Sequence, residues 1–272
     1  SNTEGVYNTA TGFASLFYNT EGEFNTANGF RALDTNTTGS HNTAIGANAL
    51  YSNTEGEFNT GVGNGTLFSN TTGIKNAAFG SGSLRSIIAG DNNTALGHAA
   101  ADSFTAGENN VAVGFRADNY NEIGSNNTII GCEAGSGGPS HSKSGCVFIG
   151  YQAGYNETAN NKLYIDNSNT SEPLIYGEFD SHELSVYGNL GIGTREFGNG
   201  TRTLALYNGN APTTSISKGV LLYAENGLNP QLSELKVRNE DGDVTTLSPH
   251  NFSMIEKSEP MAWSFYSENH NT

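Results

Sequence analysis

The chain has 272 residues, of which 14% are charged and 35% are hydrophobic, and it contains 35 glycines. This composition gives too little apolar material for a broad globular core and too little charge for an ordinary disordered chain. The formal net charge of −15 argues against nucleic-acid binding, because phosphate contacts require Lys and Arg. No apolar run is long enough to cross a membrane as a helix.

The strongest signal is a 17-residue repeat that begins at Asn8 and is marked by three columns of identical residues. The first column is Asn8, Asn25, Asn42, Asn59, Asn76, Asn93, Asn110 and Asn127. A glycine stands four residues after each Asn: Gly12, Gly29, Gly46, Gly63, Gly80, Gly97, Gly114 and Gly131. A second glycine column has the same period: Gly5, Gly22, Gly39, Gly56, Gly73, Gly90, Gly107 and Gly124. Three columns in one register over eight copies are typical of a solenoid.

Each repeat is predicted to form one coil of a parallel β-solenoid, or β-roll. Seventeen residues are too few for a helix–turn–helix unit, and no apolar stripe has helical spacing. The motif Asn-Thr-Ala-x-Gly, as in Asn42–Gly46, is followed by a second short stretch that ends in Leu. We therefore expect two short strands per coil, joined at turns where glycine supplies positive φ or permits close backbone approach. The Asn column is predicted to be scaffold, with side-chain amides that donate to one neighbouring coil and accept from the other.

Side-chain direction leads to a prediction about assembly. The third repeat position is small, as in Ala27 and Ala44, which suits the narrow inside of a coil, so the fourth position should face outward. From the third coil on, the fourth position is apolar: Ile45, Val62, Phe79, Leu96, Val113 and Ile130. Soluble monomers avoid such a continuous outer patch, so we expect a partner chain to cover it. The alternative is that inside and outside are reversed, and that this column is core.

The pattern loosens after Gly131. Cys132 and Cys146 enclose a Gly/Ser-rich loop, and they either form a disulfide or remain two buried thiols. Residues 161–177 are predicted to form two strands around a polar turn that caps the solenoid, and residues 184–194 a connecting strand.

Further along, residues 219–225 and 235–247 alternate in polarity, and the second segment is folded at Asp241-Gly242, a strong hairpin signal. The predicted organisation is therefore a solenoid (1–165), cap and connector strands (166–200), a small β module (201–253) and a tail (254–272). From the abrupt end of the tail we expect that the natural chain continues, or was trimmed, beyond Thr272.

The Asn-Thr-Ala-x-Gly units resemble the head repeats of trimeric autotransporter adhesins, over residues 5 to about 165. That resemblance implies a left-handed parallel β-roll with three chains packed around one axis, although the 17-residue period is longer than the usual head repeat. The segments GVLLYAENG and SELKVRNEDGDVTTLS are similar to modules near the C-terminal ends of phage tail fibres and related surface fibres, over about residues 160–253. In that family such modules are trimeric and interleaved.

Together these features predict a structural or adhesive extracellular fibre: a tail fibre, a surface filament or an adhesin. Such a protein would form a stiff homotrimer or homopolymer and present surfaces to a host cell or a glycan receptor. We expect no enzymatic activity, cofactor or metal, because the six His are scattered and no cluster of acids or bases is evident. Glu21, Glu23, Glu55 and Glu57 are interpreted as solvated turn carboxylates.

The alternative is a solenoid that binds a ligand such as ice on one flat face. A Thr column at the second repeat position motivates this hypothesis: Thr9, Thr26, Thr43, Thr60, Thr94 and Thr128. The column is interrupted by Ala77 and Val111, and a paired Thr-x-Thr row occurs only at Thr9 and Thr11. The fibre interpretation is therefore favoured.

Overall fold

The computed structural model describes residues 3–138, 140–188, 190–192, 204–206, 221–226, 233–238 and 244–246. Its contacts divide the chain into two compact units, Ser1–Tyr187 and Gly188–Thr272. All regular secondary structure in the described residues is β-strand, as predicted. No helix within these residues is long and apolar enough to span a membrane.

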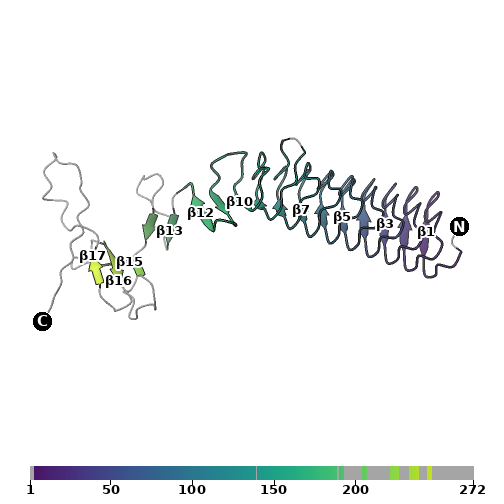
Figure 1. Ribbon diagram of the computed structural model, residues 1–272, viewed down its shortest axis with the longest axis horizontal. Helices are drawn as coiled ribbons and strands as arrows, with labels where there is room; N and C mark the ends of the chain where they lie inside the picture. The colour runs from purple at the N-terminus through teal and green to yellow at the C-terminus, as the bar shows by residue number, and fades with distance from the viewer. Residues whose placement is uncertain are drawn as a thin grey trace. The chain divides into compact units, whose positions relative to one another are not determined.

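The first unit is a parallel β-solenoid in which each coil contributes one three-residue strand (Figure 1). The strands are β1 (Thr9–Thr11), β2 (Thr26–Asn28), β3 (Thr43–Ile45), β4 (Thr60–Val62), β5 (Ala77–Phe79), β6 (Thr94–Leu96), β7 (Val111–Val113), β8 (Thr128–Ile130) and β9 (Val147–Ile149). Each strand pairs in parallel with the next, in the register of the repeat, so that Ala27 lies opposite Ala44. The predicted parallel β-solenoid is confirmed.

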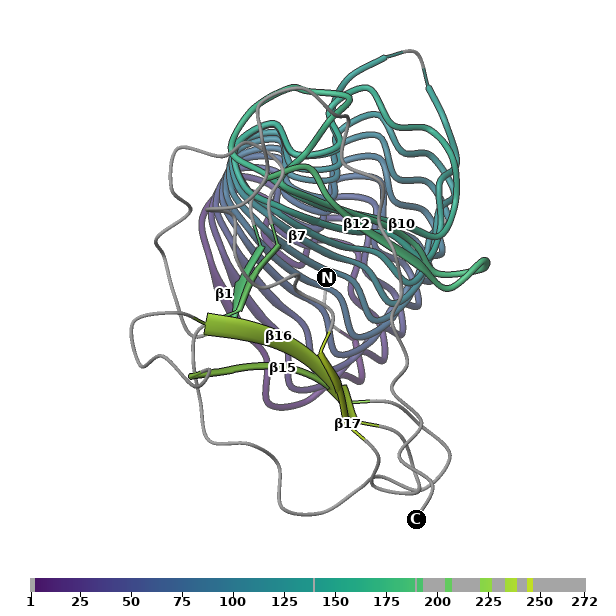
Figure 2. The same ribbon diagram turned by 90° about the vertical axis from the view of Figure 1, so that its left-hand side faces the viewer.

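The interior of the coils is narrow and filled by two columns of side chains. The third repeat position is buried, with Ala27, Ala44 and Ala78 at 0% exposure. The Leu that ends the second stretch of each coil is buried with them: Leu16, Leu33, Leu50, Leu67 and Leu84. Figure 2, which looks along the solenoid, shows that successive coils follow a similar backbone path. The predicted direction is confirmed: the third position faces inward and the fourth faces outward.

The prediction of a second strand in each coil was wrong. Residues such as Arg31 (φ 55°) and Leu33 (φ 51°) adopt the left-handed region, which interrupts an extended strand. Hydrogen bonds between coils nevertheless continue there: the Arg31 N–H donates to the Phe13 carbonyl at 2.8 Å, and the Leu33 N–H donates to the Ala49 carbonyl at 3.0 Å. The second stretch is thus a corrugated turn that stacks on its copies without forming a strand.

The two columns require glycine for partly different physical reasons. Gly29 has φ +146°, and a Cβ built on it would lie 2.4 Å from the Gly46 carbonyl oxygen. In the second column, Gly39 has no unusual φ, but its Cβ would lie 2.5 Å from both the Asn36 Oδ1 atom and the Gly56 carbonyl oxygen. Backbone crowding between coils therefore excludes a side chain from both columns, and positive φ adds to this only in the first.

A β-hairpin closes the C-terminal end of the solenoid. Strand β10 (Lys162–Ile165) pairs in parallel with β9 and antiparallel with β11 (Ile175–Glu178), which pairs in turn with β12 (Glu183–Val186). The Tyr164 ring makes edge contacts with Phe148 in the last coil and with Tyr176 on β11. The predicted two-stranded cap is confirmed, and it belongs to the same 12-stranded sheet as the solenoid.

The described residues of the second unit form two small sheets. Strand β13 (Leu190–Ile192) pairs in parallel with β14 (Leu204–Leu206). Strands β15 (Leu221–Asn226), β16 (Ser233–Arg238) and β17 (Val244–Thr246) form an antiparallel sheet, as the alternating segments predicted. The predicted Asp241-Gly242 turn and the tail 254–272 lie outside the described residues.

Candidate functional site

The predicted Asn column lies inside the coils and joins each coil to the next. Asn25 donates from Nδ2 to the Gly39 carbonyl at 2.8 Å, and its Oδ1 accepts from the Asn42 backbone N–H at 2.9 Å. The expected contact between amides occurs only in the later coils, for example from Asn110 Nδ2 to Asn93 Oδ1 at 2.9 Å. The column therefore satisfies buried backbone groups at the coil corners, which is a scaffold role.

A second buried Asn column was missed in the sequence: Asn19, Asn36, Asn53, Asn70 and Asn121. Asn36 Nδ2 donates to Asn19 Oδ1 at 2.7 Å and to the Gly39 carbonyl at 2.8 Å. The signal was an Asn three residues before the second glycine column, but Ile87 and Phe104 replace it in two coils. Beside it, Thr37 Oγ1 donates to the Thr54 carbonyl of the next coil at 3.0 Å, so this side of the coil is also hydrogen-bonded along its length.

The apolar residues at the fourth repeat position form a stripe along the outer face of the strands. The structure extends the predicted set by one coil, and this stripe, the outer column, consists of Ile45, Val62, Phe79, Leu96, Val113, Ile130 and Ile149. Leu96 is 50% exposed and Ile45 and Phe79 are each 41% exposed, while Val62 and Val113 are half-buried. The strand register places each member beside the next, so the stripe has no polar interruption over seven coils.

A second exposed group lies before the strands of the first four coils. Tyr7, Phe24, His41 and Phe58 stack face to face, with ring centroids 4.8, 4.9 and 4.8 Å apart. Their faces are covered by one another, so each ring presents its edge to solvent. The N-terminal coils therefore have an aromatic stack where the later coils have polar residues such as Lys75 and Asn92.

The remaining predicted site residues are not gathered into a site. The described part of the chain holds no group of three or more His, Cys, Asp or Glu residues placed to bind a metal ion. Glu21 and Glu55 are exposed in their turns. Thr-x-Thr occurs only in β1, and from β3 onward the outer column replaces the second Thr, so no observation favours the ice-binding alternative.

The two cysteines are free, so the disulfide alternative is wrong, and the alternative of two buried thiols holds only for Cys146. Cys132 is exposed at the corner that follows β8, whereas Cys146 is buried at the place of the Asn column. The Cys146 backbone N–H donates to Asn127 Oδ1 at 2.9 Å, as an Asn of that column would. One thiol thus faces solvent and the other faces the interior, which explains why they do not pair.

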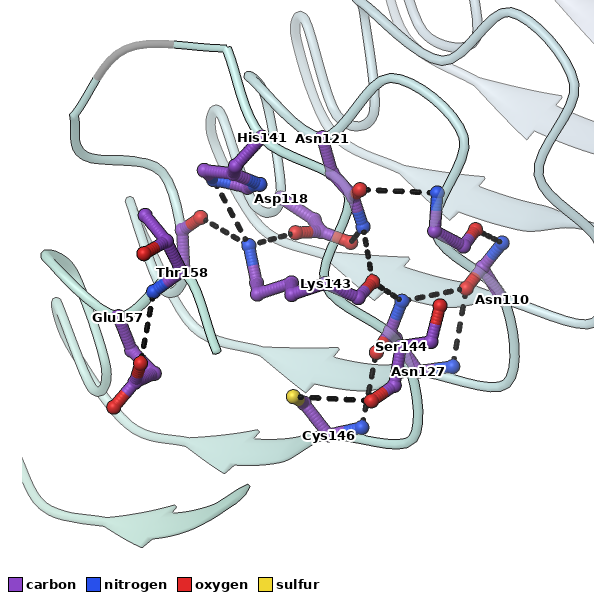
Figure 3. Close-up of polar contacts among 12 residues, drawn as sticks. Asn110, Asp118, Asn121, Asn127, His141, Lys143, Ser144, Cys146, Glu157 and Thr158 are labelled. Atoms are coloured by element: carbon purple, nitrogen blue, oxygen red, sulfur yellow. Dashed lines mark hydrogen bonds and ion pairs between the residues drawn. The ribbon is translucent and has the colours of Figure 1, made fainter. Parts of the chain in front are cut away.

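The coil that begins at Asn127 is irregular, because Cys146 begins the next coil 19 residues later instead of 17. Its interior holds an ion pair that was missed in the sequence: Lys143 Nζ lies 2.6 Å from Asp118 Oδ1, with both side chains almost fully buried (Figure 3). Asp118 stands at the place of the Leu column. The interruption of that column by an acidic residue was the available signal.

These observations define a β-solenoid repeat protein with an exposed apolar flank and a polar pair inside its last coils. No protein-family model, no curated protein and no solved structure matches the chain. The function must therefore be argued from the residues themselves.

Proposed function

We propose that this protein is the subunit of an extracellular structural fibre, a trimer whose chains pack along the outer column. The observation that carries the proposal is the continuity of that column over seven coils. An isolated chain would expose this stripe to water along the solenoid, and burial against a partner would recover about 25 cal/mol for each Å² of apolar surface. A straight stripe is matched best by an equally straight one, which a second copy of the same chain provides.

The hydrogen bonding of the coils supports a rigid rod. The first Asn column links successive coils, and the second Asn column and the Thr residues beside it add further links in the coils where they are present. Backbone hydrogen bonds between coils run beside them. A solenoid of this kind is lengthened by adding repeats without changing its cross-section. Such a rod is suited to holding an attachment surface, for a cell or a glycan, away from the structure that carries it.

The test is the native mass of the chain, measured by size-exclusion chromatography with light scattering. We expect three chains for the natural sequence and one chain for a Phe79→Thr, Leu96→Asn, Val113→Thr triple variant. Thr11 and Asn28 occupy the same position in the first two coils, so the backbone accepts these residues.

The matched control is Ile88→Thr. Ile88 is 48% exposed on a different part of the coil, in register with Thr37 and Thr54, and its replacement should leave the mass at three chains. A monomeric natural chain would overturn the proposal, and so would a triple variant that remains trimeric.

A further inference from the structure

Lys143 and Asp118 meet inside the irregular coil (Figure 3), and both charged groups are buried there. Lys143 stands where regular coils have a glycine of the second column, and its carbonyl still accepts from Asn127 Nδ2 at 2.9 Å. The side chains of Lys143 and Asp118 are 0% and 1% exposed, respectively. Burying two charges in this way carries a large desolvation cost, which their mutual attraction only partly offsets.

The Lys143 nitrogen and the two oxygens of the Asp118 carboxylate have different neighbours. Lys143 Nζ also donates to the Gly135 carbonyl at 2.8 Å and lies 3.2 Å from His141 Nε2. On the other side, Asp118 Oδ2 accepts from Asn121 Nδ2 at 3.1 Å. Asp118 Oδ1 lies 2.6 Å from Nζ but makes no hydrogen bond of ordinary geometry. One carboxylate oxygen is therefore held in place, and the other contacts only the lysine nitrogen.

We propose that Lys143 and Asp118 condense to form an intramolecular isopeptide bond with the release of one water molecule. Lys143 first passes a proton to His141 Nε2, and its Nζ then attacks Asp118 Cγ to form the C–N bond. Asp118 Oδ1 takes one proton from Nζ and one from His141, the Cγ–Oδ1 bond breaks, and water leaves. The ammonium and carboxylate charges disappear together, and His141 returns to its neutral state.

The surrounding residues suit this reaction. Asn121 Nδ2 donates to the oxygen on which negative charge develops during the attack, and that oxygen becomes the amide carbonyl. Gly135 can accept the one N–H that the new amide retains. Because the two reacting groups are held in contact with their side chains 0% and 1% exposed, the step is intramolecular and its product is shielded from bulk water.

His141 is placed to relay the proton. Burial, together with the positive charge of Lys143, lowers the pKa of His141 to about 4, against the opposing effects of Asp118, Glu122 and the Gly135 backbone. The imidazole is therefore neutral at neutral pH and only weakly basic, so it does not retain the proton from Nζ but passes it on to Asp118 Oδ1, which lies 2.6 Å from the same nitrogen. General acid–base assistance of this kind contributes about 100-fold or more to a rate.

The chain contains a matched pair that should not react. Lys162 Nζ lies 2.7 Å from Glu178 Oε1 in the cap, but the two side chains are 15% and 29% exposed. The Glu178 carboxylate also accepts from the Tyr176 hydroxyl, and no histidine is placed against Lys162 in the described hydrogen bonds. The nitrogen–oxygen distance is similar to that between Lys143 and Asp118, but the Lys162–Glu178 pair is neither buried nor accompanied by a base.

The experiment is intact-mass spectrometry of the full chain, followed by trypsin digestion after denaturation. We expect a mass lower than that of the sequence by one water, and no cleavage after Lys143, since an acylated lysine is not a trypsin site. The digest should then contain peptide 117–162, lighter by one water, in place of peptides 117–143 and 144–162. Cleavage after Lys162 should be normal.

Two variants complete the test. Lys143→Met should have its full sequence mass, and His141→Gln should be purified with its full mass and lose water about 100-fold more slowly on incubation. His141→Gln keeps both reacting groups, so it is informative even where Lys143→Met folds poorly.

A natural chain of full sequence mass that is cleaved after Lys143 overturns the proposal. Ring closure at Asp241-Gly242 also releases water. A water loss mapped to that dipeptide, with normal cleavage after Lys143, would overturn the proposal equally.

Discussion

The coils around β2–β5 and those around β8 and β9 share one backbone path but fill it differently. In the first group the interior combines Ala at the third position with Leu in the second stretch. In the second group Ile129 and Phe148 replace Ala, and Gly135 and Gly154 stand where Leu would be. A Cβ on Gly154 would lie 2.7 Å from the Phe148 ring, so the larger residue occupies the space that the smaller one leaves.

This comparison separates what is fixed in the coil from what can vary. The first glycine column is the same in both groups, since Gly131 and Gly150 follow β8 and β9 and a Cβ on either would meet backbone atoms of the next coil. At the end of the irregular coil Lys143 and Cys146 replace a corner glycine and an Asn, but the corner hydrogen bonds to Asn127 are kept. The interior has only to keep its total volume. Gly can therefore replace Leu where Phe replaces Ala at the third position, and Asp118 can replace Leu where its side chain meets Lys143. Breaking a corner should therefore cost more than changing the interior.

The largest effect is expected for Gly46→Ala. Its φ of +130° and the 2.4 Å approach of a Cβ to the Gly63 carbonyl oxygen should separate two coils, with a loss of more than about 4 kcal/mol in the free energy of unfolding. Urea denaturation followed by circular dichroism measures this loss.

The control is Gly65→Asn. Gly65 has φ +60° with nothing within 4 Å, and Asn48 adopts φ 55° one coil earlier, so a change below about 1 kcal/mol is expected. Equal losses for the two variants would refute crowding between coils as the reason for glycine at Gly46.

An intermediate effect is expected when the buried pair is broken from one side. Lys143→Met leaves Asp118 buried without its cation and without the proposed bond. The double variant Asp118→Leu, Lys143→Met also lacks the bond but restores the Leu column, so its free energy of unfolding should exceed that of Lys143→Met by about 3–5 kcal/mol. A double-mutant cycle by urea denaturation measures the coupling, and purely additive losses would contradict it.

The smallest effect concerns the two thiols and involves no loss of stability. Burial raises the pKa of Cys146, so at a given pH a smaller fraction of this thiol is the reactive thiolate. Cys132 is exposed, and iodoacetamide should label it first, with Cys146 labelled only after denaturation. Mass spectrometry of the labelled peptides checks this order, and simultaneous labelling of the folded protein would contradict it.

The coil could be predicted because its strongest constraints act on residue type. Crowded corners demand glycine, and buried backbone groups demand Asn, so both appear as columns. The left-handed conformation of Leu33 does not select a residue type, because stacking against neighbouring coils imposes it on an ordinary leucine. The prediction of a second strand was wrong for this reason. The Asp118–Lys143 pair escaped because the two extra residues before Cys146 shift Lys143 out of register. The subunit interface stays a prediction.

The bonds between coils also bear on mechanics. Backbone bonds such as that from Thr43 N–H to the Asn59 carbonyl join one coil to the next, so they lie along the direction in which the solenoid grows. A pull on the two ends of the solenoid would load them in series and open the coils one at a time. Each opened coil would add roughly 50 Å of slack, since an extended residue spans about 3.4 Å. The solenoid would then lengthen in equal steps under load, and in the proposed fibre this would limit the force on the attachment.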